Sequence, residues 1–299
     1  MAQVVKIANV GFTTPNRDLM TAYYTETLGL KLASQGDDGL FLGSGNDHHS
    51  IALYPGAGSS IAHITFQIRP DTSLKEVAAQ LERAGIPGEL MSDAQPGIAE
   101  LLQITDPSGN TLQLYQSAES AGHGISTTGI APNKLGHLAL CVDNIDAMVA
   151  FYETHLGFRV SDWMEHFFVF LRCGPDHHTV NFIDTGKRKL HHIAFQLRDF
   201  AHVQGACDHL AKQRIPLLWG PGRHGLGHNI FTYHNNPDEQ KVELFTQLDT
   251  MLDESLGYFE PRPWHEDYPQ RPKVWSFSPA AANTWGIMPP DGFMERGQH

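Results

Sequence analysis

Two histidines and one glutamate in the second half of the sequence have the side chains that bind a divalent metal ion. They are His137 in the segment LGHLAL, His192 in LHHIAF and Glu243 in KVELF. Two imidazoles and one carboxylate on one face leave other coordination positions open, as in the facial triad of non-haem Fe(II) oxygenases. Those open positions allow a substrate and O₂ to bind together. We therefore expect these three residues to bind Fe(II), with Mn(II) as an alternative for the same ligand set.

His191 directly precedes His192 and competes with it for the ligand position. Successive residues of a strand face opposite sides of a sheet, so only one of the two is expected to point toward the metal. The pattern His-Leu-Ala-Leu that begins at His137 aligns with His-Ile-Ala-Phe beginning at His192. We therefore choose His192 and expect His191 to face outward or to support the ligands.

The chain contains an internal repeat of domain size. FLGSGNDHHSIAL at 41–53 recurs as FLRCGPDHHTVNF at 170–182, and IAHITFQ at 61–67 recurs as LHHIAFQ at 190–196, both 129 residues later. A constant offset between distant segments indicates a tandem duplication. The sequence thus predicts four parts. Residues 1–117 form an N-terminal module without metal, and 118–133 form a linker rich in Ser, Gly and Thr. Residues 134–252 form a C-terminal catalytic module, and 253–299 form a tail that packs on this module.

The duplication allows the two modules to be compared position by position. Where the second module has His137, His192 and Glu243, the first has Asn9, His63 and Gln113. Asn and Gln preserve size and polarity but are weaker ligands and carry no charge. The comparison favours one metal site, in the second module. The alternative is three separate polar residues that form ordinary hydrogen bonds within a sheet.

Each module shows the same alternation of strands and helices. An apolar strand (5–12; 134–142) precedes an amphipathic helix that ends before Leu-Gly, where Gly can adopt the left-handed conformation of a helix end. Two strands, a further strand (62–68; 192–197), a second helix (73–84; 200–213) and a closing hairpin follow. This pattern predicts the α+β class, with two βαβββ units per module curled into a half-open barrel.

Composition excludes several classes of partner. The 299 residues include 21 Lys and Arg against 33 Asp and Glu, a net charge of −12, which disfavours nucleic acid and anionic membranes. No apolar run is long enough to span a bilayer, and the start of the chain lacks a signal-peptide pattern, so we expect a cytoplasmic protein. Three cysteines without a CxxC pair disfavour a disulfide framework or a thiolate zinc site, whereas 18 histidines are consistent with metal chemistry.

The motifs together resemble those of the type I extradiol catecholic dioxygenases of the vicinal oxygen chelate superfamily. The resemblance covers about residues 1–275, and the most specific segment is GPGRHGLGHNIFTYHNNPDEQKVELF at 220–245. It implies that His178 is an acid/base group near the O₂ site, and that His224 and Tyr233 form hydrogen bonds with the substrate hydroxyl and with intermediates. The same resemblance suggests pocket walls at Ala139, Phe170 and Pro263. His228 is a further candidate.

The resemblance implies an oxidoreductase of aromatic catabolism that cleaves a catechol next to its hydroxyls with O₂, and that forms a homo-oligomer. A glyoxalase-like metal isomerase or lyase is a second interpretation. It is less favoured because such enzymes usually draw carboxylate ligands from both modules, whereas the first module offers Asn9 and Gln113. A metal-free protein that binds a small aromatic molecule is a third interpretation. Such a protein would not need His137 and Glu243 together with His178 and Tyr233.

Overall fold

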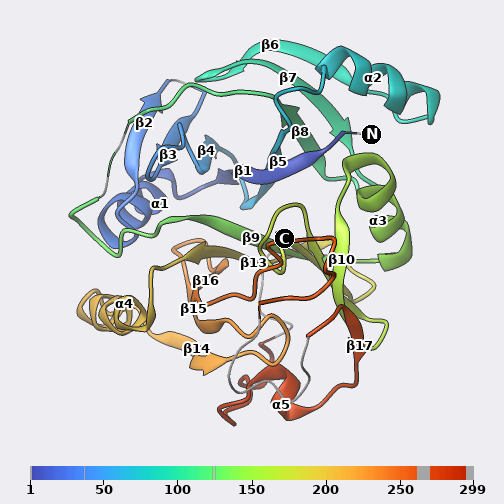
Figure 1. Cartoon of the computed structure of the whole chain (residues 1–299). Coiled ribbons are helices and arrows are strands. Elements are labelled where there is room, and N and C mark those ends of the chain that lie inside the picture. The colour runs from blue at the N-terminus through green and yellow to red at the C-terminus, as the bar shows by residue number, and fades with distance from the viewer. Residues whose placement is uncertain (1, 37, 123, 125, 261–269, 294–299) are drawn as a thin grey trace.

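The computed structural model describes residues 2–36, 38–122, 124, 126–260 and 270–293. Two strongly curved sheets make up most of the molecule, the first drawn in blue to teal and the second in green to orange in Figure 1. The first sheet contains β1 (Val4–Thr14), β2 (Lys31–Gln35), β3 (Leu40–Gly43), β4 (Ile51–Pro55), β5 (Ser60–Ile68), β6 (Glu89–Gln95), β7 (Ile98–Thr105) and β8 (Thr111–Tyr115).

The second sheet repeats this arrangement and adds one strand from the tail. It contains β9 (Lys134–Val142), β10 (Arg159–Met164), β11 (Phe168–Arg172), β12 (Val180–Asp184), β13 (Lys189–Gln196), β14 (Leu217–Arg223), β15 (Ile230–Asn235), β16 (Lys241–Thr246) and β17 (Lys273–Trp275). The helices are α1 (Arg17–Ala22), α2 (Leu74–Arg83), α3 (Ile145–Phe151), α4 (Phe200–Lys212) and α5 (Pro279–Ala282), with the π-helical turns η1 (Tyr23–Thr27) and η2 (Tyr152–Leu156).

The strand orders confirm the duplication and the predicted fold class. The first sheet runs β2-β3-β4-β1-β5-β8-β7-β6, and the second runs β10-β11-β12-β9-β13-β16-β15-β14, with β17 beside β10. Each half therefore consists of two βαβββ units, whose first strands pair antiparallel at the centre of the sheet. The predicted Leu-Gly helix ends are also present, since Gly29 and Gly157 have φ of 80° and 78°.

Four strands that the sequence pattern does not reveal complete these units. They are β2, β6, β10 and β14, the first strand after each helix. In the first half these strands, β2 and β6, are largely exposed. Along β6, apolar and polar residues alternate only weakly. Strand β17 was also not expected. It extends the second sheet by pairing parallel with β10.

The two halves share one hydrophobic core because each contributes a helical turn to the other. Tyr24 of η1 packs on Phe195 of the second sheet, at 6.5 Å between ring centroids. Tyr152 of η2 packs on Phe66 of the first sheet, at 6.3 Å. Phe66 and Phe195 are equivalent positions of the repeat, so the exchange is reciprocal. The buried apolar cluster accordingly includes residues from both halves. No helix in the described part of the chain is long and apolar enough to cross a lipid bilayer.

A buried histidine at this interface makes stability depend on pH. The Nε2 of His234 lies 2.7 Å from the Tyr23 hydroxyl, and burial lowers the pKa of His234 from 6.5 to about 3. Between these values the folded state binds fewer protons than the unfolded state. We expect the wild type, relative to His234→Gln, to lose stability as pH falls below 6.5, by up to about 1.4 kcal/mol per pH unit.

Chemical denaturation at several pH values would measure this difference. Other buried histidines titrate alike in both proteins and cancel. The variant His166→Gln, at an exposed position, is the matched control and should follow the wild type. Parallel pH profiles for wild type and His234→Gln would contradict the prediction.

Candidate metal centre

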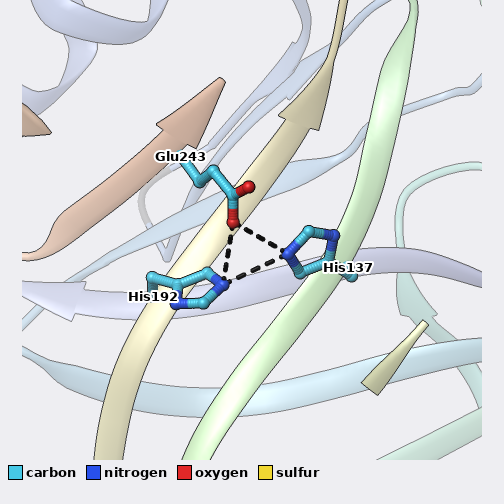
Figure 2. Close-up of side chains that lie close together, drawn as sticks. All are labelled: His137, His192 and Glu243. Atoms are coloured by element: carbon cyan, nitrogen blue, oxygen red, sulfur yellow. Dashed lines mark hydrogen bonds and ion pairs between the residues drawn. The ribbon is translucent and has the colours of Figure 1, made fainter. Parts of the chain in front are cut away.

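The central strands of the second sheet bring the three predicted ligands together. Strand β13 lies between β9 and β16, and Ala194 pairs with His137 on one side and Glu243 on the other. His192 precedes Ala194 by two residues and therefore shares its face of the sheet. Figure 2 shows the three side chains pointing toward a common point from these strands.

The ligand atoms form a nearly equilateral triangle. Nε2 of His137 lies 3.0 Å from Oε2 of Glu243 and 3.1 Å from Nε2 of His192, and Nε2 of His192 lies 3.1 Å from the same carboxylate oxygen. A metal about 2.1 Å from each of three atoms, at right angles, leaves those atoms about 3 Å apart. The donor set and its spacing therefore fit one facially coordinated divalent cation. Among the described residues, this is the one group of His, Cys, Asp and Glu close enough to hold a metal.

Burial and mutual attraction set the charge states that a metal requires. Burial alone raises the pKa of Glu243, but the attraction of His137 and hydrogen bonds with both histidines hold this pKa well below its usual range. Burial lowers the pKa of His192 to about 4 despite the opposing effect of Glu243. At neutral pH Glu243 is thus ionised and His192 is neutral, the states in which each offers a lone pair to a cation.

Residues around the triad hold the carboxylate in place. Asn229 donates its amide N–H to Oε1 of Glu243 at 2.8 Å, and the Tyr233 hydroxyl lies 3.0 Å from Oε2. His224 lies beside Tyr233, with 3.1 Å between its Nε2 and the hydroxyl, and its Nδ1 lies 2.7 Å from the carbonyl oxygen of Ala282. A carbonyl only accepts, so neutral His224 carries its proton on Nδ1 and presents a bare Nε2 to Tyr233. The Tyr233 hydroxyl therefore has two acceptors.

Of the two alternatives for His191, the one in which it faces outward is wrong. It is buried, and its Nδ1 lies 2.7 Å from Nδ1 of His192. An irregularity in the pairing of β13 with β9 between Leu190 and His192 breaks the strict alternation of the strand. His191 thus takes the supporting position that was the other alternative, because a metal-binding His192 carries its proton on Nδ1 and donates it to a neighbour.

The triad lines a cavity of about 220 Å³ with mostly apolar walls. Aromatic and aliphatic side chains of the second sheet form one part, and the tail forms another. The residues beyond the triad and its polar neighbours include Met164, Phe168, Phe170, Trp219, Leu226, Phe277, Ala281, Met288 and Phe293. Such a cavity suits a flat apolar molecule with a few polar groups at the metal end.

The predicted site residues fall into three groups. His178, His224, Tyr233 and Phe170 line the cavity, and the ring of His178 lies 4.3 Å from that of His137. Two predicted wall residues do not line it, which corrects their assignment. Ala139 is buried within the sheet opposite His192, and His228 turns its Nδ1 to the Asp249 carboxylate, 2.5 Å away. Pro263 lies outside the described residues.

Several cavity residues have no counterpart in the sequence analysis. Asn229 occupies a loop position at which the N-terminal half has no matching polar residue, so the repeat comparison could not reveal it. Phe277, Met288 and Phe293 come from the tail, which has no equivalent in the first half. The aromatic content of the tail is the only sequence signal that could have suggested their part in the wall.

The equivalent place in the first half is a closed network of neutral polar groups. Thr65 pairs with both Asn9 and Gln113, the same register as Ala194 with His137 and Glu243. Gln95 joins this network by accepting from Asn9 at 3.1 Å and donating to Gln113 and to Thr65. His63 directs its Nε2 to the Tyr54 hydroxyl at 3.1 Å, while its Nδ1 lies 3.1 Å from the Thr65 hydroxyl of the network. Here the ligand positions are used for hydrogen bonds.

The comparisons with known proteins agree with this architecture. Residues 6–114 and 134–244 both match the model of the Glyoxalase/Bleomycin resistance protein/Dioxygenase superfamily. A manganese-dependent 2,3-dihydroxybiphenyl 1,2-dioxygenase of Geobacillus genomosp. 3 is 24% identical over 304 residues, covering 92% of this chain and 94% of the relative. A 3-methylcatechol 2,3-dioxygenase of Pseudomonas putida is 26% identical over 261 residues, covering 80% and 89%. The resemblance inferred from the motifs is thereby confirmed.

Solved structures support the fold. The Mn(II)-bound glyoxalase from Novosphingobium aromaticivorans superposes with a TM-score of 0.85 at 24% identity, covering 98% of this chain and 95% of the other. A substrate complex of homoprotocatechuate 2,3-dioxygenase from Brevibacterium fuscum gives 0.84 at 20% identity, covering 99% and 93%. Both similarities concern the arrangement of the two halves and their sheets.

The geometry predicts a graded response of metal affinity to substitution. Glu243→Gln removes the only charged ligand and installs the residue type of the first half, so Mn(II) affinity should fall by more than the roughly 10- to 100-fold typical of supporting residues. Asn229→Ala leaves all three ligands and should cost about that smaller factor. Isothermal titration with Mn(II) would measure both. Equal affinities of Glu243→Gln and the wild type would contradict the assignment.

Proposed function

Because the chain belongs to the Glyoxalase/Bleomycin resistance protein/Dioxygenase superfamily, we propose that it is an extradiol dioxygenase that opens a catechol-type ring next to its hydroxyls with O₂. The observation that carries the proposal is a triangle of two histidines and one carboxylate facing an apolar cavity that also contains His178, His224 and Tyr233. Relatives named as diol dioxygenases, at 24 to 26% identity, support it. The product would be a ring-opened compound of the 2-hydroxymuconic-semialdehyde type.

We propose Fe(II) as the resident ion, with Mn(II) as the alternative. The ligand set suits either ion, and one relative is named as manganese-dependent. His137, His192 and Glu243 would hold the ion, which would supply open coordination positions for the diol and O₂ and a path for electron density between them. Every remaining requirement of the reaction falls to the protein.

The proposed roles of the protein groups follow from their positions. The apolar wall, including Phe170, contacts the ring and excludes water. Burial, together with repulsion from His137, lowers the pKa of His178 well below its usual range, so His178 is neutral and can accept a proton from a diol hydroxyl. Burial and the Glu243 charge raise the pKa of Tyr233 well above 10, so its hydroxyl stays protonated and can donate to a substrate oxygen.

A glyoxalase-like isomerase and a metal-free binding protein are the competing functions. The first usually needs strong ligands from both halves, but Asn9 and Gln113 are amides already engaged in hydrogen bonds with Gln95. The second has no use for a buried carboxylate that two imidazoles face. Both observations favour the dioxygenase.

Anaerobic loading with Fe(II) or Mn(II), addition of a diol and then of O₂ would test the function. We expect O₂ uptake equal to the diol consumed and a yellow product, with at least one of catechol, 3-methylcatechol and 2,3-dihydroxybiphenyl. Replacing the proton acceptor, as in His178→Phe, should lower kcat by about 100- to 10,000-fold while metal remains bound. Absence of O₂ uptake with all three diols and both ions would overturn the proposal.

A further inference from the structure

A buried chain of hydrogen bonds leads from the tail to the cavity through Asp162, His177 and His178. The backbone N–H of Lys273 donates to Oδ1 of Asp162 at 2.8 Å. Oδ2 of Asp162 lies 3.0 Å from Nε2 of His177, and Nδ1 of His177 lies 3.0 Å from Nδ1 of His178. The side chains of Asp162 and His177 are at most 1% exposed. Neither residue lines the cavity, and the proposed function assigns no role to either.

The chemistry of the groups fixes the direction of each hydrogen bond. A carboxylate only accepts, so His177 must donate from Nε2 to Asp162. A neutral imidazole has one N–H, and Nδ1 of His177 is then a bare acceptor. His178 must therefore donate from its own Nδ1, which leaves Nε2 of His178 without a proton.

We propose that Asp162 and His177 are positioning residues that fix the tautomer of His178, so that its bare Nε2 is available to the substrate. This inference rests on the proposed function, because it specifies how the proton acceptor of that site is prepared. In the proposed step the O–H bond of a diol hydroxyl breaks and its proton moves to Nε2 of His178. The electron pair stays on the diol oxygen, and His178 becomes an imidazolium.

The surroundings of His177 hold its ring in this orientation. The rings of Phe259 and Phe170 lie 4.8 and 5.7 Å from that of His177 and pack against it. Gly227 approaches so closely that a Cβ at this position would lie 3.0 Å from Nδ1 of His177, so the ring has little freedom to turn. Asp162 accepts from two N–H donors, the backbone of Lys273 and Nε2 of His177.

The first half of the molecule contains the same pair of histidines without the carboxylate. His48 and His49 lie with their Nδ1 atoms 2.9 Å apart, but Nε2 of His49 faces the amide oxygen Oε1 of Gln95 at 2.7 Å. Oε1 accepts, so Nε2 of His49 carries the proton and His48 is the donor at Nδ1. By strand register, Ser34 replaces Asp162, since Ser34 pairs with Phe41 as Asp162 pairs with Phe170. The carboxylate and the bare Nε2 thus occur together, in the half with the metal ligands.

The variant Asp162→Asn should reverse the direction of the chain. The N–H of Lys273 needs an acceptor, which holds the amide oxygen of the new side chain at the Oδ1 position and places its NH₂ toward Nε2 of His177. His177 must then carry its proton on Nδ1 and donate to His178. Nε2 of His178 would become protonated and could no longer accept a proton.

The direct test is ¹⁵N NMR of the full chain, freed of metal and labelled at histidine, because bare and protonated ring nitrogens have well-separated shifts. We expect His178 to be protonated at Nδ1 in the wild type and at Nε2 in Asp162→Asn. A wild-type His177 protonated at both nitrogens, or a His178 protonated at Nε2, would overturn the proposal. This measurement does not depend on turnover, so it stands apart from the fate of the proposed function.

Kinetics of the metal-loaded protein supply the second readout. We expect Asp162→Asn to lower kcat by about 100- to 10,000-fold, the range for loss of a general base, with KM and metal affinity within a few-fold of the wild type. Asp106→Asn is the matched control, since it changes a buried carboxylate in a turn of the first half. It should retain wild-type kcat even if it lowers Tm. An unchanged kcat in Asp162→Asn, or an equal loss in Asp106→Asn, would contradict the proposal.

Discussion

The register of three central strands is the constraint on which the site depends. Glu243 and His137 lie level with Ala194 because β16 and β9 both pair with β13, and His192 follows on the same face. A slip of one residue in either pairing would turn a ligand to the opposite side of the sheet. The reciprocal packing of Tyr24 and Tyr152 on the sheet of the other half opposes such a slip, because it couples the two sheets through one core.

Small residues also distinguish the two sets of ligand positions, since the strand pairing is the same in both halves. Ala194 offers only a methyl group between the ligand positions, whereas the Thr65 hydroxyl forms hydrogen bonds with Gln95 and Gln113 and completes the network there. At the next residue pair of the two central strands, a Cβ at Gly11 would lie 2.3 Å from Nε2 of His63. His63 therefore occupies the space that the methyl group of Ala139 fills in the second half. The methyl of Ala139 therefore keeps His192 from taking that orientation, although Ala139 does not line the cavity.

The fold could be predicted from sequence because it is encoded twice, and the triad because two of its three positions differ between the copies. The repeat located the strands that carry His137, His192 and Glu243. The replacement of His137 by Asn9 and of Glu243 by Gln113 in the first half marked two of these positions. Asp162 and Asn229 could not be found this way. Asp162 lies on a strand whose alternation is too weak to locate, and its function depends on contacts with residues 15 and 111 positions away in the sequence. Such contacts leave no periodic pattern.

The distribution of buried carboxylates connects the metal triad to the histidine chain. A buried carboxylate is costly unless donors or a cation compensate its charge. Glu243 has Asn229 and the two imidazoles, and Asp162 has two N–H donors. In the first half both carboxylates are absent and neutral residues, Gln113 and Ser34, take their places. Gln113 and Ser34 avoid both buried charges, so the ligand carboxylate and the carboxylate proposed to position His178 occur together in one half and are absent together from the other.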